Sequence, residues 1–257
     1  MKVLEYGKEH PKNIVLFECT AEPWWVFEDS AKELGKSYHV YLMIADGHDE
    51  SGKDFTSIED YARDSANWLK EHNVKEIEAL YGCSMGETTV VRFLFTEEIP
   101  VHKAIIDGGL TPYEYPWLLR KMILCIDVLG ITLATKCLPI MKLAAPPAKW
   151  TPKGEDPKQH YARIYAFEKQ HYSLKTIRNV FWSTNNYSLP SPLPSVTVPI
   201  TYWYGEGEAS ARRNNRKKIR ELFPQATFKQ FDGKEHAELL LMYPEEFAKE
   251  VTAYLSN

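Results

Sequence analysis

One short stretch, Gly82 to Gly86 (GCSMG), constrains this chain more than any other part of its sequence. It stands between a plausible strand, residues 75–81 (KEIEALY), and a helix-like segment, residues 87–95 (ETTVVRFLF). A serine at such a tight strand-to-helix turn is pushed out of the sheet, and the crowded backbone there needs neighbours without a Cβ atom. The N–H groups at the start of the following helix would point at the serine oxygen and stabilise negative charge on it. We therefore interpret Ser84 as a nucleophile at a strand-to-helix elbow, with a purely structural turn as the alternative.

Strand-like and helix-like segments alternate along most of the chain. Continuous apolar runs such as residues 13–17 (NIVLF) and 38–44 (YHVYLMI) are typical of strands buried on both faces. Helices between such strands indicate a mostly parallel sheet that is covered on both faces. The predicted strands are 13–17, 38–44, 75–81, 103–106, 200–204 and 227–231, and the predicted helices among them are 24–34, 58–69, 87–95, 210–222 and 244–255.

The alternation is interrupted between residues 110 and 193. This stretch contains no convincing strand, and its two helix-like segments, 117–142 and 157–182, are accompanied by proline-rich sequence. We predict that it forms a helical cap over the strand ends. Residues 1–109 and 194–257 would then form the core domain, and 110–193 the cap insertion. The alternative is that these helices only cover a face of the sheet.

Composition argues against several classes of protein. Hydrophobic residues make up 44% and charged residues 26%, which is ordinary for a globular protein, and the net charge of −4 argues against nucleic acid as the main partner. The most apolar region, residues 117–145, is interrupted by charges, so we expect no membrane span. We expect no signal peptide, because residues 1–11 are short, mixed and charged. The four cysteines lack metal-finger spacing, which is typical of reduced thiols in a cytoplasmic protein.

Two later motifs complete a pattern that begins at Ser84. Tyr204 to Glu208 (YGEGE) follows a predicted strand and ends on a carboxylic acid, and Gly233 to Leu240 (GKEHAELL) follows the last strand and contains His236. Nucleophile, acid and histidine in this order, each at a strand end, resemble the α/β-hydrolase superfamily over nearly the whole chain. The resemblance implies an α/β-hydrolase fold, with a mostly parallel central sheet flanked by helices. It also implies that the helical cap is inserted after the sixth strand of the family order.

The resemblance further implies a catalytic triad. A serine hydroxyl is a poor nucleophile until an imidazole removes its proton, and His236 would remove it from Ser84 and return it to the leaving group. A carboxylate behind the ring fixes its tautomer and stabilises the imidazolium, and Glu208 falls on the acid position. Asp107, at the end of another predicted strand, and Glu206 are alternatives for the acid.

The oxyanion of a tetrahedral intermediate needs two N–H donors. By the resemblance these are the amide of Met85, directly after the nucleophile, and the amide of Thr20 in the loop after the first buried strand. The family usually has His-Gly-x in this loop, whereas this sequence has Glu18 and Cys19 there. Either the loop bends differently, or Glu18 turns away into a structural hydrogen bond, which we favour.

Other residues border the predicted site. Trp24 and Trp25, just past the oxyanion loop, are candidate substrate-binding walls of a pocket. A basic run from Arg212 to Arg220 follows Glu208 closely. A solvated helix face explains this run, with an anion-recognition patch as the alternative.

Together these residues predict a carboxylesterase-like serine hydrolase that cleaves a small ester, lactone or related acyl substrate through an acyl-enzyme. Hydrolysis of a carbon–carbon or amide bond, or acyl transfer, would use the same triad. A catalytically silent small-molecule-binding module is the alternative of another class, because fold analogy cannot choose the chemistry. No metal or organic cofactor is implied. The expected partner is a small-molecule substrate, with no nucleic acid and no membrane, and the pattern leaves a homodimer open.

Overall fold

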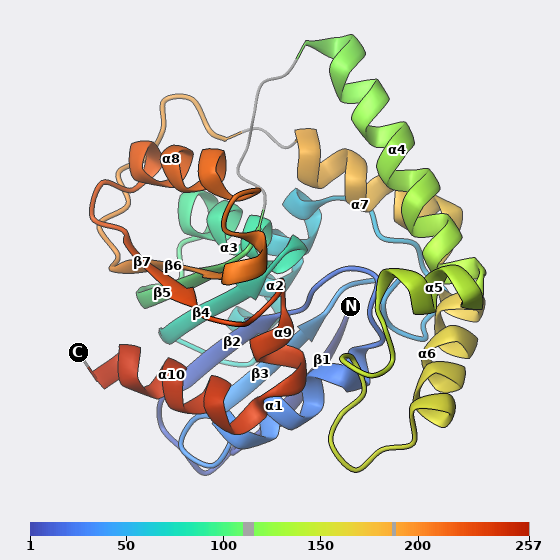
Figure 1. Cartoon of the computed structure of the whole chain (residues 1–257). Coiled ribbons are helices and arrows are strands. Elements are labelled where there is room, and N and C mark those ends of the chain that lie inside the picture. The colour runs from blue at the N-terminus through green and yellow to red at the C-terminus, as the bar shows by residue number, and fades with distance from the viewer. Residues whose placement is uncertain (110–115, 187–188, 257) are drawn as a thin grey trace.

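The computed structural model describes residues 1–109, 116–186 and 189–256 (Figure 1). Its strands are β1 (Lys2–Tyr6), β2 (Asn13–Phe17), β3 (His39–Ile44), β4 (Ile77–Cys83), β5 (Val101–Asp107), β6 (Ile200–Gly205) and β7 (Thr227–Phe231). These strands form one sheet in the order β1-β3-β2-β4-β5-β6-β7. Strand β1 pairs antiparallel with β3, and the other neighbouring strands are parallel.

The six predicted strands are all present, and β1 is one that the sequence analysis missed. Its five residues, KVLEY, mix apolar and charged side chains, and all five are half-buried. An edge strand with one solvated face lacks the continuous apolar run that reveals a central parallel strand. The central strand β2, with its continuous apolar run, could therefore be read from hydrophobicity, whereas β1 could not.

Helices cover both faces of the sheet and close two separate hydrophobic clusters. On one face lie α1 (Glu28–Leu34) and α10 (Pro244–Ser256), and on the other lie α2 (Ile58–Glu71), α3 (Met85–Thr96) and α8 (Arg213–Leu222) (Figure 1). Side chains of α1 and α10, such as Phe27 at the start of α1 and Phe247, are fully buried against the first face. Val90 of α3 and Ile219 of α8 are fully buried against the second. The parallel strands are thus buried on both sides, as their apolar runs predict.

The insertion between β5 and β6 consists of helices. These are α4 (Trp117–Lys136), α5 (Leu138–Ala144), α6 (Pro157–His171) and α7 (Leu174–Asn186). The predicted helix over 117–142 is wrong in one respect, because the chain bends by 113° between α4 and α5. Pro139, in the first turn of α5, lacks the N–H that a continuous helix would need there. Residues 110–115, at the predicted start of the cap, lie outside the described residues.

Helix α7 attaches the cap elements to the core through the segment that leads into α2. The Thr176 hydroxyl accepts a hydrogen bond from the Phe55 amide at 3.1 Å, and the Ser183 hydroxyl accepts one from the Ile58 amide at 2.7 Å. Asn179 donates its side-chain amide to the carbonyl oxygen of Phe55 at 2.8 Å. Backbone groups next to α2 are therefore satisfied by side chains of α7, which attach this helix to the core.

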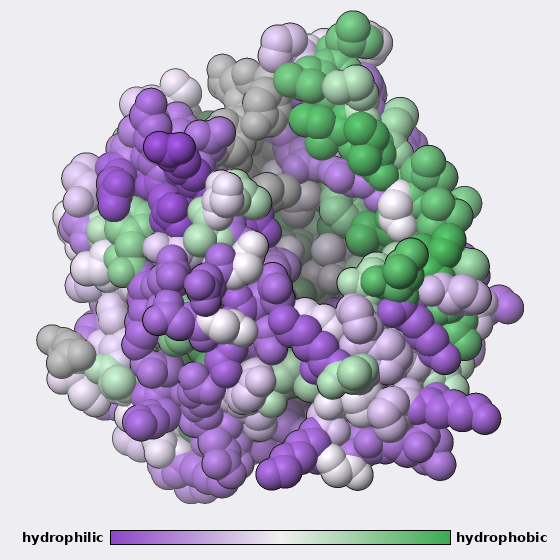
Figure 2. All heavy atoms as spheres, viewed as in Figure 1, coloured by the Kyte–Doolittle hydropathy of each residue, from purple (hydrophilic) through white to green (hydrophobic). Residues whose placement is uncertain are grey.

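The outer face of α4 and α5 is unusually apolar (Figure 2). Leu118 is 72% exposed and Leu143 is 82% exposed. The exposed apolar residues of α4 are Trp117, Leu118, Met122, Ile126, Leu129 and Leu133. Within the described residues, no helix is by itself long and apolar enough to cross a membrane, although α4 and α5 together pass the length and composition test as a bent pair.

The sheet topology places one end of the sheet under the cap. The chain runs from β2 to β3 on one side and then returns to β4 on the other side of β2. Loops that leave the adjacent carboxyl ends of β2 and β4 therefore diverge, and such a switch point is where open α/β sheets bind ligands. Ser84 follows β4 at this position.

Candidate active site

Ser84 has the strained backbone that the GCSMG motif predicts. Its φ is +56°, and it precedes Met85, the first residue of α3. A Cβ atom on Gly82 would lie 2.1 Å from the Gly86 carbonyl oxygen, and one on Gly86 would lie 2.5 Å from the Phe17 carbonyl oxygen. Neither contact is tolerable, so this turn requires both glycines. The strain supports a functional role for the residue at the apex, because non-glycine residues in this conformation are costly.

The loops after β6 and β7 bring Glu208 and His236 together. His236 Nδ1 lies 2.9 Å from Glu208 Oε2, in position to donate a hydrogen bond to the carboxylate. Glu208 is buried in the short 3-10 helix η2 (Glu206–Glu208). Its other oxygen, Oε1, accepts a hydrogen bond from the Gly205 amide at 3.2 Å. The contact joins residues 28 positions apart, in the arrangement that the sequence predicts for the acid and the imidazole of a triad.

Arg212 is a second partner of Glu208 that the sequence analysis missed. Its Nε donates to Glu208 Oε2 at 2.6 Å, and its side chain is 17% exposed. Arg212 therefore differs from the solvated helix face that the basic run suggested. The signal was present in the sequence, since a Glu and an Arg four residues apart meet on one side of a helical turn.

Two hydrogen-bond partners, His236 and Arg212, decide the protonation state of Glu208. Burial by itself raises the pKa of this carboxyl, but hydrogen bonds and charges from His236 and Arg212 outweigh burial and lower the pKa below its usual value. Glu208 thus stays ionised at neutral pH, as an acid that orients a histidine must.

The two alternative acids have other partners. Asp107 Oδ2 accepts a hydrogen bond from the Tyr81 hydroxyl at 2.5 Å, and burial raises the pKa of Asp107 to about 6. Glu206 accepts a hydrogen bond from the Gly233 amide at 2.8 Å. Gly108, next to Asp107, lies so close to His236 that a Cβ atom there would be 2.6 Å from Nδ1. The geometry therefore favours Glu208 as the acid and leaves Asp107 close by.

The loop after β2 faces Ser84 and has an unusual composition. As expected, Glu18 turns into a structural hydrogen bond, in which its Oε1 accepts from the Ala45 amide at 2.8 Å. The Glu18 side chain is fully buried, and burial raises its pKa well above the usual value. Burial thus disfavours the ionised form of this carboxyl, which lies near the predicted oxyanion position.

A tyrosine of the cap fixes the same loop. The Tyr172 hydroxyl accepts a hydrogen bond from the Ala21 amide at 2.7 Å and lies 2.9 Å from Thr20 Oγ1. Ala21 has a φ of +60°, so the chain turns sharply after Thr20. Met85 is the first residue of α3, where amides have no acceptor within the helix. The Thr20 and Met85 amides remain the predicted oxyanion donors.

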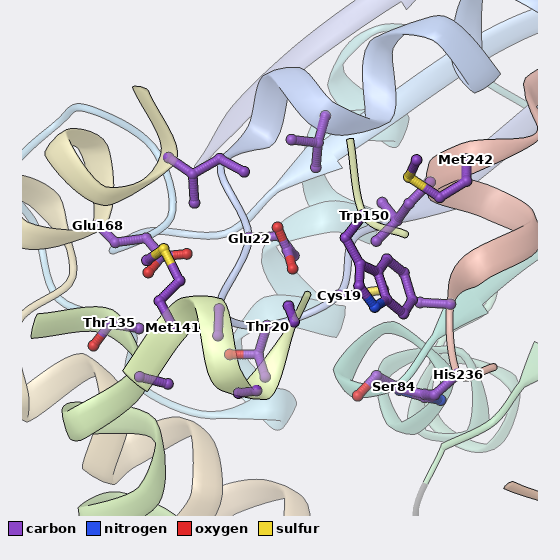
Figure 3. Close-up of a pocket in the computed structure, with 18 of the residues that line it drawn as sticks. Cys19, Thr20, Glu22, Ser84, Thr135, Met141, Trp150, Glu168, His236 and Met242 are labelled. Atoms are coloured by element: carbon purple, nitrogen blue, oxygen red, sulfur yellow. The ribbon is translucent and has the colours of Figure 1, made fainter. Parts of the chain in front are cut away.

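A cavity of about 590 Å³ extends from Ser84 and His236 to the helices of the insertion. Ser84, His236 and Arg212 line it from the core, and residues of α4, α5 and α6 line it from the cap. Figure 3 shows Ser84 and His236 on one side of this cavity, Thr135, Met141 and Glu168 on the other, and Glu22 between them. The cavity is large enough for a small organic substrate. Among the described residues, no hydrogen bond joins Ser84 to His236.

The two tryptophans that follow the oxyanion loop have different positions. Trp25 lines the cavity, whereas Trp24 does not. The Trp24 ring packs beside the core cluster of α1 and carries the Lys2 ammonium 3.4 Å from its centre. Both residues belong to the 3-10 helix η1 (Trp24–Phe27), in which successive side chains point about 120° apart. The cavity therefore supports Trp25 and not Trp24 as a wall, and substrate binding stays a prediction for both.

Two acidic residues in the cavity were missed. Glu22 lies in the loop between β2 and η1, and Glu168 lies on α6. Glu168 occupies the buried face of this helix, together with His160, Tyr161, Ile164 and Phe167. The sequence did contain a signal for Glu168. It is a carboxylic acid on a helix face whose other residues are mostly apolar or aromatic. No group of three or more His, Cys, Asp or Glu side chains in the described part of the chain could hold a metal ion.

Comparison with known proteins finds similarity to solved structures. No protein-family model and no curated protein matches the sequence. Among solved structures, an α/β-hydrolase family protein from Desulfitobacterium hafniense has a TM-score of 0.77 at 18% identity, with 99% of this chain and 100% of that chain covered. MenH from S. aureus has a TM-score of 0.75 at 17% identity, covering 99% and 97% of the two chains.

An esterase from Exiguobacterium antarcticum, EaEST, is similarly close, with a TM-score of 0.74 at 17% identity and coverage of 99% and 95%. At these identities the similarity concerns the fold and leaves the chemistry to the site itself. The strand order, the elbow at Ser84 and these three structures agree that the chain has the α/β-hydrolase fold.

Proposed function

We propose that this protein is a serine hydrolase that cleaves a small ester, lactone or related acyl substrate through an acyl-enzyme. The observation that carries the proposal is a single cavity lined by Ser84, at φ +56°, and by His236, whose Nδ1 lies 2.9 Å from an ionised Glu208. A strained serine at a helix N-terminus and an imidazole with an oriented tautomer are what nucleophilic acyl transfer requires. Similarity to an esterase fold is consistent with this chemistry.

Acylation begins when the Ser84 hydroxyl approaches the substrate carbonyl. His236 Nε2 takes the hydroxyl proton as the bond from the serine oxygen to the carbonyl carbon forms. The carbonyl oxygen becomes an oxyanion, to which the Met85 and Thr20 amides donate hydrogen bonds. The intermediate collapses, His236 returns the proton to the departing alcohol oxygen, and Ser84 keeps the acyl group. Glu208 stabilises the imidazolium throughout, because it is itself held ionised by Arg212.

Deacylation repeats these steps with water. His236 removes a proton from the water molecule as its oxygen bonds to the acyl carbon, and then returns that proton to the Ser84 oxygen as the ester bond breaks. The products are a carboxylic acid and the regenerated serine. A lactone would give a hydroxy acid by the same route.

Covalent labelling tests the nucleophile directly. We expect a fluorophosphonate probe to label the wild-type protein and to leave Ser84→Ala unlabelled, and we expect this variant to lose at least about 10⁴-fold in kcat on p-nitrophenyl acetate. Ser195→Ala is the matched control, because Ser195 is an exposed serine outside the cavity. Equal labelling of wild type and Ser84→Ala would refute the assignment, and a wild type that is not labelled would favour a silent binding module.

A further inference from the structure

The cap end of the cavity contains carboxyl groups without partners. Glu168 is 3% exposed, yet among the described residues its carboxyl oxygens have no hydrogen bond and no ion pair. Glu22 is half-buried, lines the same cavity and likewise has no such partner among those residues. A buried polar group without a partner costs free energy, and a bound ligand is one way to satisfy it.

The nearest cation does not satisfy Glu168. Lys136 on α4 donates to the carbonyl oxygens of Glu168 at 2.7 Å, Lys169 at 3.1 Å and Tyr172 at 2.6 Å. All three donors of its ammonium are therefore occupied by the C-terminal end of α6. Lys136 stabilises the helix end and leaves the carboxyl facing the cavity.

Other basic side chains of the cavity are also engaged. Arg212 and His236 pair with Glu208, at 2.6 Å and 2.9 Å, and His160 pairs with Glu155 at 2.7 Å. Among the described residues that line the cavity, no basic side chain is left for Glu22 or Glu168. The cap end therefore contains two carboxyl groups without a basic partner, and a cationic group of a bound ligand can pair with them.

The walls around these carboxyls are aromatic. Trp25, Trp150 and Tyr161 line the cavity, and Trp150 is labelled beside Glu22 in Figure 3. The Glu22 charge reaches Tyr161, since burial and this charge together raise the pKa of Tyr161 to about 12. Carboxylates combined with the faces of aromatic rings are the recurring means of binding an ammonium group.

We propose that the cap end of the cavity binds the ammonium group of the substrate between Glu22 and Glu168, against Trp150 and Tyr161. This inference rests on the proposed function only in taking the bound molecule to be an acyl substrate. The substrate class is then an ester or related acyl compound that carries a primary or quaternary amine at the end remote from the scissile bond.

Protonation of the two acids gives the proposal a distinctive signature. Burial, the charge of Glu22 and, in the opposite direction, Lys136 set the pKa of Glu168, which is raised to about 9, and burial raises the pKa of Glu22 to about 7. In the empty cavity at pH 7, Glu168 therefore holds its proton. An ammonium group favours the ionised carboxylate, so binding releases a proton to the buffer, and affinity for the ammonium rises with pH from 6 to 9.

Binding to Ser84→Ala protein tests this site without any turnover. The probes are tetramethylammonium and n-butylammonium, and the neutral comparison ligand is 3,3-dimethylbutanol, measured by titration calorimetry in two buffers of different ionisation enthalpy. We expect an ammonium ligand to bind with proton release and at least about tenfold more tightly than the neutral alcohol. Preference for tetramethylammonium or butylammonium identifies a quaternary or a primary amine.

Variants of the carboxyls locate the effect. Glu168→Gln and Glu22→Gln, each combined with Ser84→Ala, should weaken ammonium binding about tenfold or more and reduce the proton release, with the larger reduction in Glu168→Gln, whereas Glu246→Gln, an exposed glutamate outside the cavity, should change neither. Equal affinity for the ammonium ligands and the neutral alcohol would overturn the proposal, even if the Gln variants fail to fold. Ammonium binding without fluorophosphonate labelling of the wild type would instead refute the hydrolase and keep the site.

Discussion

The two ends of the cavity differ in how their charges are balanced. At the catalytic end, Glu208 receives hydrogen bonds from His236 and Arg212, and its pKa is lowered. At the cap end, Glu168 has no such partner among the described residues, and its pKa is raised to about 9. Both carboxyls are nearly fully buried, so burial does not distinguish them. The protein itself thus supplies the partners of Glu208, whereas Glu168 is left for a substrate to pair with.

The largest effect should come from a substitution at the catalytic end, where the charge of Glu208 is paired. Glu208→Gln removes the charge that orients His236 and leaves Arg212 without its carboxylate, so we expect kcat to fall about 10³-fold or more with little change in KM. Steady-state kinetics on p-nitrophenyl acetate measure this.

Two matched variants accompany Glu208→Gln. Glu206→Gln changes a carboxyl two residues away that bonds the Gly233 amide, and Asp107→Asn changes the carboxyl held by Tyr81. Both should retain activity within about tenfold of wild type, because neither removes the partner of His236. If Asp107→Asn alone abolished turnover, the acid would be Asp107.

An intermediate effect should come from the tyrosine that connects the two ends. Tyr172→Phe removes the hydroxyl that binds Ala21 and Thr20, so the oxyanion loop loses its contact with the cap. We expect kcat to fall about tenfold, and the free energy of unfolding to fall by about 1–3 kcal/mol because the Ala21 amide loses its acceptor. Kinetics and urea unfolding measure the two quantities.

Tyr243→Phe is the control for this change. Tyr243 is a partly exposed tyrosine whose ring lies under the Lys234 ammonium, and phenylalanine keeps that contact. An unchanged kcat in Tyr172→Phe would show that the loop after β2 keeps its conformation without this hydroxyl. The two ends of the cavity would then act independently.

The smallest effect concerns stability at the unbalanced end. The folded-state pKa of Glu168 lies above its unfolded value, so the folded state binds the extra proton, and the wild type loses stability as pH rises from about 4.5 towards 9. The side-chain amide of Glu168→Gln does not titrate in this range, so this pH dependence is absent from the variant. Its free energy of unfolding relative to wild type should therefore increase with pH, by at most about 1.4 kcal/mol per pH unit in this window.

Urea unfolding of both proteins at pH 6 and pH 8.5 measures this difference. Glu246→Gln should show no comparable change, because Glu246 is exposed. A difference between Glu168→Gln and wild type that stays constant with pH would mean that Glu168 is ionised in the folded protein and has a partner there.

The same difference between the two ends explains which residues of the site could be predicted from the sequence. The catalytic end depends on strand ends, which apolar runs and turn glycines mark, so Ser84, Glu208 and His236 could be placed from local patterns. Trp24 could not be oriented, because the 3-10 geometry that turns it away from Trp25 leaves no hydrophobic pattern. The break at Cys137 depends on Pro139, and proline is also tolerated in the first turn of a helix, so the sequence alone did not show where α4 ends.

The cap end was harder to predict for a different physical reason. Glu22 and Glu168 are 146 residues apart and meet through the packing of α6 over the loop after β2. Neither belongs to a motif, and although Glu168 stands on an otherwise apolar or aromatic helix face, nothing local connects it with Glu22. Their common cavity follows from tertiary structure, which periodicity does not encode.

The position of Asp107 has a consequence for how such a protein can change over generations. A second carboxyl group stands at the end of β5, next to the glycine against which His236 lies, and one tyrosine hydroxyl holds it. The charge of His236 already acts on the pKa of Asp107, so a chain that lost Glu208 would keep a second carboxyl in the electrostatic neighbourhood of the same imidazole. Two strand ends of this fold thus present an acid to one histidine.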